Sequence, residues 1–87
     1  MAEMYSERFH LKVRITRHAM QRMLARSITE VELALIIEEG QTRYKDEKRL
    51  WIAYRFEARS DNLLCVPVVL EDELIVKTAM NHFSWEG

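Results

Sequence analysis

Cysteine, glycine and proline are scarce in this sequence of 87 residues, which contains one cysteine, two glycines and one proline. The single Cys65 excludes an intramolecular disulfide. The three histidines show no HxH or HExxH spacing, so the chain carries no recognisable zinc motif. Because Gly40 and Gly87 are the only glycines, a glycine-rich phosphate loop is also excluded. We therefore expect a protein without disulfide, metal or cofactor.

Long apolar runs are missing too. The longest, such as residues 66–70, fall far short of the roughly 20 residues that a membrane-spanning helix needs. Residues 1–7 carry two acids and no apolar stretch, so they do not resemble a secretory signal. A composition of 48% hydrophobic and 31% charged residues is ordinary for a globular protein. We expect one domain over residues 1–87, in the cytoplasm and without membrane contact.

Charge is distributed unevenly along the chain, although the net charge is only −1. Residues 8–26 contain no acid and six cations, which are Arg8, Lys12, Arg14, Arg17, Arg22 and Arg26. Such an electropositive segment attracts phosphates or an acidic partner protein. The alternative is that folding brings acids from elsewhere beside these cations, which then only solvate one face of the domain.

The first predicted helix follows a short strand. Residues 11–16 alternate between apolar and polar positions, which is typical of a strand. Thr16 is suited to cap a helix that runs from there to about Arg26. Three apolar residues at helical spacing form the expected core side of this helix: Met20, Met23 and Leu24.

A second helix is marked more clearly. Thr29 and Glu32 form the pattern of a capping box, and the flanking Ile28 and Leu33 are spaced for a hydrophobic staple. The helix is expected to end one residue before Gly40. That glycine is expected to take the left-handed conformation that commonly follows a helix.

The second half of the chain is predicted to be β-structure. Residues 41–44 and 50–57 are expected to be strands joined by a turn at residues 45–48. Residues 63–70 form a nearly continuous apolar strand, in which Pro67 cannot donate a hydrogen bond and implies an edge or a bulge. Acidic residues turn the chain into a last strand over residues 74–80, and the aromatic tail packs back. The pattern predicts an α+β fold, with two N-terminal helices packed on one face of an antiparallel sheet of three to five strands.

Three charged residues of the first helix form the leading candidate site. His18, Arg22 and Arg26 stand at positions i, i+4 and i+8, so they lie along one face. An imidazole, whose ordinary pKa is about 6.5, beside guanidinium groups suits cleavage of RNA through its 2′-hydroxyl. The histidine would move a proton, and the arginines would stabilise the negative charge of the transition state. The structural alternative is that His18 packs at the junction of helix and sheet while the arginines cover a polar side.

Other candidates lie in the predicted strands. Lys77 and Thr78 are neighbours on the last strand, so they face opposite sides and only one of them can point at a given site. Three aromatic residues could supply a surface on which nucleic-acid bases stack: Tyr44, Trp51 and Tyr54. Aromatic residues in strands more often serve packing, which is the simpler interpretation.

One stretch of the sequence resembles a known family signature. Residues 15–28 read Ile-Thr-Arg-His-Ala-Met-Gln-Arg-Met-Leu-Ala-Arg-Ser-Ile. They are similar to the N-terminal signature His-Ala-x-x-Arg-Met-x-x-Arg-Gly-Ile of an uncharacterised bacterial family of domains of unknown function. In that family a helix ending in glycine and a last strand with a Val-x-Thr core follow, which correspond here to residues 31–40 and 76–78. The resemblance covers about residues 13–80, with Ser27 in place of the signature glycine.

That family is grouped with RelE/ParE-like toxins and related metal-independent ribonucleases. The resemblance implies a RelE-like fold, in which two helices lie on a curved antiparallel sheet. It also implies that His18, Arg22 and Arg26 are catalytic-site residues, with Thr78 on the last strand lining the same cleft. The partners it implies are RNA and a cognate antitoxin or another acidic protein. We therefore expect a bacterial toxin-type RNA-binding protein that acts as a metal-independent endoribonuclease, although its charge is less basic than is usual for such toxins.

The alternative function is a non-catalytic domain that binds a partner or forms a homodimer. Its basis is the second predicted helix, which is apolar on nearly all sides through Val31, Leu33, Ala34, Leu35, Ile36 and Ile37. In a domain of this size, such a helix is either deeply buried or part of an interface.

Overall fold

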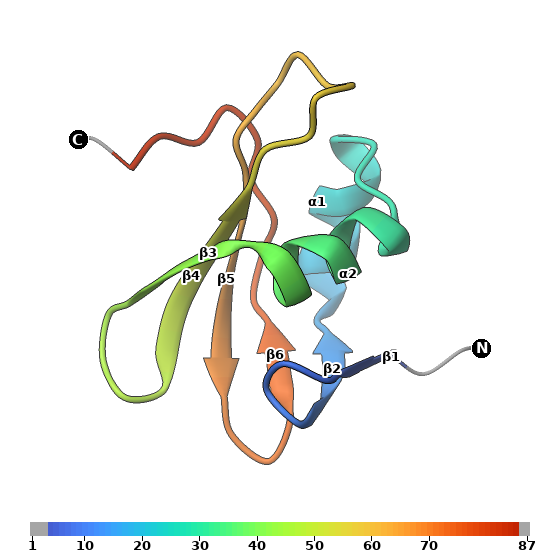
Figure 1. Ribbon diagram of the computed structural model, residues 1–87. Helices are drawn as coiled ribbons and strands as arrows, with labels where there is room; N and C mark the ends of the chain where they lie inside the picture. Colours follow the sequence, from blue (N-terminus) through green and yellow to red (C-terminus); the bar gives the residue numbers. More distant parts are fainter. Residues whose placement is uncertain (1–3, 86–87) are drawn as a thin grey trace.

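The computed structural model describes residues 4–85, which form six strands and two helices (Figure 1). The strands are β1 (Met4–Ser6), β2 (Leu11–Ile15), β3 (Gln41–Tyr44), β4 (Arg49–Tyr54), β5 (Leu64–Leu70) and β6 (Leu74–Val76). The helices are α1 (Arg17–Ala25) and α2 (Glu30–Glu39). Neither described helix has the length and apolar character needed to cross a membrane.

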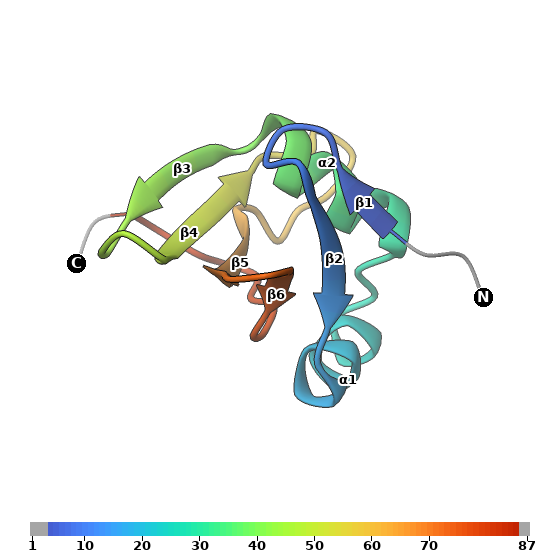
Figure 2. The same cartoon turned by 90° about the horizontal axis from the view of Figure 1, so that it is seen from below.

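The six strands form one sheet in the order β1-β2-β6-β5-β4-β3. All neighbours run antiparallel except β2 and β6, which are parallel. Figure 2 shows that the sheet is curved, that α2 lies in its hollow, and that α1 continues from the end of β2. The predicted α+β class, with two helices packed on a sheet, is confirmed.

The sheet differs from the prediction in strand number and in one direction of pairing. It has six strands rather than three to five. The strand that the prediction omitted, β1, is three residues long, too short to show the alternation on which strand prediction depends. A parallel β2–β6 pair is possible because two helices and three strands separate its members in the chain, which gives the long connection that parallel strands need.

The core lies between the hollow of the sheet and the helices. Its buried side chains are Ala19, Met23, Ile28, Leu33, Ile36, Ile37, Leu50, Ile52, Leu64, Val66, Val68, Leu74, Val76 and Ala79. The prediction of Leu24 as a core residue is wrong, because its side chain is 74% exposed. α1 rests on the domain only with the side that Ala19 and Met23 form, and Leu24 lies outside that stripe.

The turn between α1 and α2 is a Schellman motif. The Ser27 N–H donates to the Leu24 carbonyl at 3.3 Å, and the Ile28 N–H donates to the Met23 carbonyl at 2.8 Å. Ile28 and Met23 are both buried, which gives the apolar contact that accompanies this motif. Ser27 has a φ of 54°, in the left-handed region that favours glycine. The serine therefore stands where the backbone suits glycine better.

Replacing Ser27 with glycine is expected to raise the free energy of unfolding by about 0.5–1 kcal/mol. The left-handed conformation costs a residue with a Cβ roughly 1–2 kcal/mol, part of which glycine offsets through its larger loss of chain entropy. The fold loses little else, because the Ser27 side chain is exposed. Urea unfolding of the variant measures the gain. Ser60→Gly, in an exposed loop position without a positive φ, is the control; an equal gain there would contradict the argument.

Gly40 ends α2 in a different way from the one predicted. Its φ is −71°, so the predicted left-handed conformation is wrong. Glycine is required here for space, because a Cβ would clash with the Ile36 carbonyl oxygen and would lie 2.7 Å from Cγ2 of Ile52 and 2.8 Å from the Ala53 carbonyl oxygen. The close approach brings the end of α2 directly onto β4.

Gly40→Ala is accordingly expected to lower the free energy of unfolding by about 2–3 kcal/mol, the usual cost of forcing extra atoms into a packed interior. Two of the three obstructing atoms belong to the backbone, so the strain has no inexpensive relief. Urea unfolding at neutral pH measures the loss. Gln41→Ala at the neighbouring exposed position serves as control and should change the stability by less than about 0.5 kcal/mol.

Pro67 interrupts the pairing of β5 with β6. Of the two predicted alternatives, the edge position is wrong, since β5 lies between β4 and β6. The bulge is present, because two residues of β5 oppose three residues after β6 between the pairs Val68–Val76 and Cys65–Met80. The register places Pro67 opposite Lys77, whose N–H donates to the Pro67 carbonyl at 3.0 Å. Proline has no N–H to donate in return. β6 therefore ends at Val76 instead of running to residue 80 as predicted, and pairing resumes only between Cys65 and Met80.

Candidate functional site

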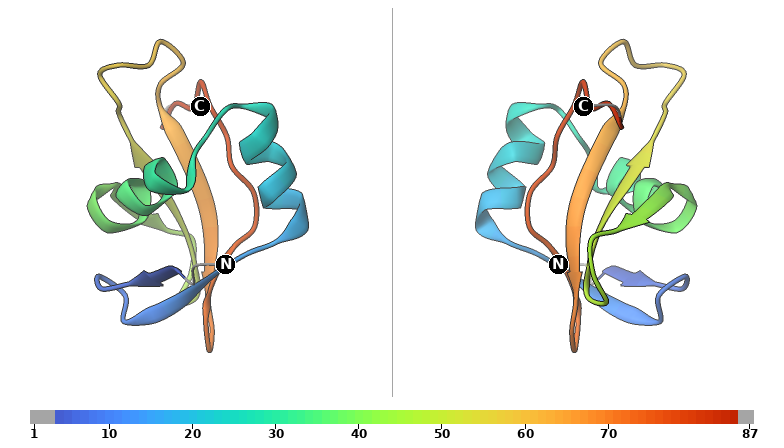
Figure 3. Two further views of the ribbon diagram at one scale, coloured as in Figure 1. Left: turned by 90° about the vertical axis from the view of Figure 1, so that its right-hand side faces the viewer. Right: turned by 90° about the vertical axis from the view of Figure 1, so that its left-hand side faces the viewer.

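α1 is attached at both of its ends to the segment that follows β6, and Figure 3 shows the two side by side. At the start of the helix, the hydroxyl of Thr16, the predicted N-cap, lies 3.0 Å from the Val76 carbonyl oxygen. It also lies 3.3 Å from the Lys77 carbonyl oxygen, to which the proline of β5 cannot donate. Beyond the last turn, Nε of Arg26 donates to Oδ1 of Asn81 at 3.1 Å. These contacts fix the orientation of α1.

The predicted site residues of α1 occupy one flank of the helix. His18 and Arg22 are exposed, whereas Arg26 is half-buried. This gradient arises because positions i, i+4 and i+8 drift around the helix, here towards the inner side formed by Ala19 and Met23. Within residues 4–85, the side chains of His18 and Arg22 form no hydrogen bond or ion pair. The structural alternative placed His18 at the junction of helix and sheet. The structure contradicts it, because His18 is exposed.

Folding gives several cations of the basic segment a structural role. The Arg8 guanidinium donates to the Ile37 carbonyl at 3.1 Å and to the Gly40 carbonyl at 2.8 Å, and so caps the negative end of α2. Arg14 pairs with Glu73 at 3.0 Å. The arginines of this segment that form no such contact with the described residues are Arg17 and Arg22. The positive charge that remains open to a ligand is therefore concentrated on α1.

Thr78 follows β6 and is half-buried on the segment that runs beside α1. It lies in the chain between the attachment points of the helix. No hydrogen bond among the described residues joins its side chain to His18, Arg22 or Arg26. The structure brings Arg26 to Asn81 and puts Thr78 on the neighbouring segment. A joint catalytic role of these residues stays a prediction.

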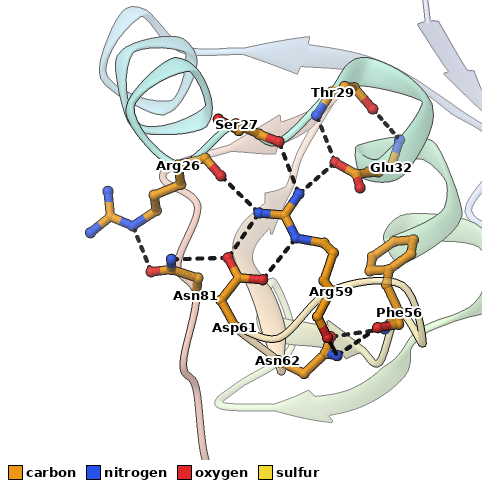
Figure 4. A network of polar contacts seen from close by, with 9 residues as sticks. All are labelled: Arg26, Ser27, Thr29, Glu32, Phe56, Arg59, Asp61, Asn62 and Asn81. Carbon is orange, nitrogen blue, oxygen red and sulfur yellow. Dashed lines mark hydrogen bonds and ion pairs between the residues drawn. The ribbon is translucent and has the colours of Figure 1, made fainter.

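A second polar cluster lies where the α1–α2 turn meets the loop between β4 and β5 (Figure 4). This Arg59 network comprises Arg26, Ser27, Glu32, Arg59, Asp61 and Asn81. Nη1 of Arg59 donates to the Ser27 carbonyl and to Oε1 of Glu32, both at 2.9 Å. Nη2 donates to the Arg26 carbonyl and to Oδ2 of Asp61, both at 2.8 Å, and Nε donates to Oδ1 of Asp61 at 2.8 Å. Asn81 completes the network by donating to Oδ2 of Asp61 at 3.1 Å.

The centre of the Arg59 network is largely shielded from water. The side chains of Arg59 and Asp61 are 16% and 19% exposed. Hydrogen bonds from Arg59, and then from Asn81, hold the pKa of Asp61 far below its ordinary value, and Asp61 in turn raises the pKa of Arg59. Both groups stay charged at neutral pH. They therefore hold the turn after α1 in place and do not exchange protons.

Sequence reasoning did not find this network. It interpreted Thr29 with Glu32 only as a capping box, which the structure confirms. The partners of Arg59 in α2 and in the α1–α2 turn stand 27, 32 and 33 positions away. No local spacing rule connects residues so far apart in the chain.

Comparison with known proteins identifies the family. A family model described as a domain of unknown function, DUF4258, matches residues 15–81. The chain belongs to the DUF4258 family. No curated protein and no solved structure matches it. The DUF4258 match runs from the last residue of β2 to Asn81, so it includes α1, the segment beside it and every member of the Arg59 network.

Neither the single cysteine nor the metal-ligating side chains that the structure of this DUF4258 protein describes offer a competing site. Cys65 is fully buried in β5, and burial raises the pKa of its thiol to about 12, so it remains protonated and inert. Across residues 4–85, no three His, Cys, Asp or Glu side chains are grouped to hold a metal ion. The basic flank of α1 remains the leading candidate site.

Proposed function

We propose that this DUF4258 protein is a RelE-like, toxin-type protein that binds RNA along the flank of α1 and cleaves it without a metal ion. The observation that carries the proposal is the state of His18 and Arg22. Both side chains are exposed one turn apart, and neither has a hydrogen bond or ion pair among the described residues. A guanidinium left without a carboxylate beside an exposed imidazole suits a phosphate ligand.

The proposed reaction is transfer of the phosphate within the RNA strand. The 2′-oxygen attacks the neighbouring phosphorus while His18 takes the 2′-hydroxyl proton. The bond from phosphorus to the 5′-oxygen breaks, and the departing oxygen takes a proton from water. The products are a 2′,3′-cyclic phosphate and a 5′-hydroxyl. Arg22 and Arg26 stabilise the extra negative charge on phosphorus, and the hydroxyl of Thr78 borders the same site.

The decisive experiment is incubation of a mixed RNA pool with the purified protein in EDTA. The expected result is cleavage with 2′,3′-cyclic phosphate ends, which distinguishes the proposed chemistry from a metal-dependent hydrolysis. Absence of cleavage by the folded protein would remove the enzymatic part of the proposal. In that case, RNA binding with strong salt dependence and no turnover indicates a non-catalytic role.

A second candidate function is docking of a partner protein, such as an antitoxin, or of a second copy on the helices. The observation that favours it is a shallow groove between α1 and α2, lined by Met20, Met23, Leu24, Ser27, Ile28, Thr29 and Glu30. Leu24 in its lining is 74% exposed, and Val31, the next residue of α2 after Glu30, is 72% exposed. Apolar side chains so open to water are typical of an interface. Sedimentation tests the homodimer directly, and a monomer at micromolar concentration would contradict it.

A further inference from the structure

A small pocket lies at the edge of the sheet that is farthest from β1. At this edge, strand β3 enters its turn towards β4. Its volume is about 240 Å³, and it is lined by Arg43, Tyr44, Lys45 and Trp51. Two of these residues are aromatic, two are cationic and none is acidic. Figure 2 shows the β3–β4 hairpin well apart from α1, so the pocket is separate from the basic flank described above.

The aromatic wall of the pocket is held in place from behind by the C-terminal segment. The ring of Trp51 meets the ring of Phe83 edge to face, with centroids 5.8 Å apart, and Phe83 meets Trp85 in the same way at 5.0 Å. The Arg43 guanidinium lies over the ring of Trp85, 4.6 Å from its centroid. These contacts order one side of the wall and leave Trp51 39% exposed, while Tyr44 is 53% exposed. Packing alone therefore does not account for the exposed aromatic surface.

The charge of Asp46, in the turn next to this pocket, is directed elsewhere. Asp46 accepts hydrogen bonds from the backbone N–H groups of Lys48 and Arg49 and pairs with the Arg49 side chain at 2.7 Å. These bonds lower the pKa of Asp46 to about 2 and bind its charge within the turn. Arg43 and Lys45 are the charged residues that line the pocket. Their complement is an anion that carries a flat ring.

We propose that this pocket binds one base of a single-stranded nucleic acid, which stacks against Trp51 while Arg43, paired with Trp51 across the hairpin, and Lys45 contact the adjacent phosphates. Stacking on aromatic side chains with cations tracking the backbone is how proteins bind single strands without reading their sequence. The volume suits one base. The site adds to the RNA binding proposed for α1 and depends on it only for the class of ligand, because no residue is shared between the two surfaces.

An oligonucleotide that cannot be cleaved separates this proposal from the proposed enzymatic activity. A single strand of eight deoxythymidines has no 2′-hydroxyl, and a strand of eight abasic sites has the same charge without bases. The two tryptophans, Trp51 and Trp85, lie at or beside the pocket and report binding by fluorescence. The expected result is quenching by the deoxythymidine strand with a Kd about 10-fold or more below that of the abasic strand. Equal affinities, or no binding of either strand, overturn the proposal.

Two matched variants locate the binding. Trp51→Ala is expected to reduce the affinity ratio to about 1, with Trp85 as the remaining fluorophore, whereas Tyr5→Ala, at an exposed aromatic residue of β1, retains it. Lys45→Ala is expected to remove about one phosphate contact. The plot of log K against log salt concentration should become less steep by the corresponding amount. Loss of base-dependent binding in Tyr5→Ala to the same degree as in Trp51→Ala overturns the proposal even when cleavage is observed.

Discussion

Replacing Arg59 with alanine is expected to lower the free energy of unfolding by about 3 kcal/mol, which corresponds to a fall in Tm of roughly 12–24 °C for a domain of this size. The substitution leaves the carboxylates of Asp61 and Glu32 without their partner in a site that is mostly shielded from water. It also leaves the carbonyls of Arg26 and Ser27 without their hydrogen bonds from Arg59. Urea and thermal unfolding at pH 7 measure the loss.

Two variants show whether the loss comes from the network or only from the charge. Arg55→Ala removes the same charge at an exposed position of the same loop and should change the stability by less than about 0.5 kcal/mol. Arg59→Lys keeps the charge but cannot reproduce the planar set of five donor contacts, so it should recover only a small part of the loss. If Arg59→Lys were as stable as the native protein, charge alone would account for the effect and the network argument would fail.

The stabilisation by Arg59 also has a defined pH dependence. The folded pKa of Asp61 lies below its unfolded value of about 4, so the contribution of this pair is fully present above that pH. This contribution is lost as the pH falls from about 4 through the folded pKa of Asp61. Below the folded pKa, Asp61 is protonated in both the folded and the unfolded state. The difference in stability between the native protein and Arg59→Ala should therefore be constant from pH 8 to pH 5 and should shrink below pH 4.

The parts of the fold that the sequence predicts correctly are those with short-range causes. The start of α1 at Thr16 and the capping box of Thr29 and Glu32 depend on side chains that reach backbone groups only three residues away. β2 shows the alternation of apolar and polar residues that a half-buried sheet requires, and in β4 the buried Leu50 and Ile52 flank the exposed Trp51. Residues close in sequence are necessarily close in space, so these patterns persist in the folded chain.

The features that the sequence does not predict depend on contacts made across the chain. Gly40 was expected to adopt a particular backbone angle, whereas it is required because Ile52 and Ala53 approach it from β4. The early end of β6 follows from a proline on the opposing strand rather than from any residue of β6. Arg59 has no local pattern at all, because its partners are assembled only when α1, α2 and the segment after β6 meet. Each of these features can be predicted only when the tertiary structure is known.

The basic segment shows the same division with a functional consequence. Its arginines stand in one acid-free run, yet Arg8 caps a helix and Arg14 pairs with an acid almost sixty positions away. The sequence predicts the charge of this run but not which charges the fold itself uses. When the arginines that have structural partners are set aside, the arginines on the flank of α1 remain. The predicted positively charged binding segment is thereby narrowed to residues whose replacement should not disturb the fold.

Arg22→Ala is therefore expected to reduce RNA cleavage in EDTA by at least about 100-fold while leaving Tm nearly unchanged. Loss of one charged group that stabilises a transition state commonly costs a factor of about 100–1,000 in rate. The stability cost is limited to the favourable interaction of a cation with the C-terminal end of α1, about 0.3–0.5 kcal/mol, since the side chain has no partner among the described residues.

The matched control for this prediction is Arg17→Ala. It removes the same charge from the same helix, and its side chain is also exposed and without a hydrogen bond or ion pair among residues 4–85. Five positions separate it from Arg22, so the two side chains lie on different flanks. Arg17→Ala should retain most of the cleavage, whereas His18→Ala should lose it as Arg22→Ala does. Equal losses in Arg17→Ala and Arg22→Ala would mean that α1 attracts RNA only by its net charge, and a large fall in Tm with Arg22→Ala would assign that arginine to the fold.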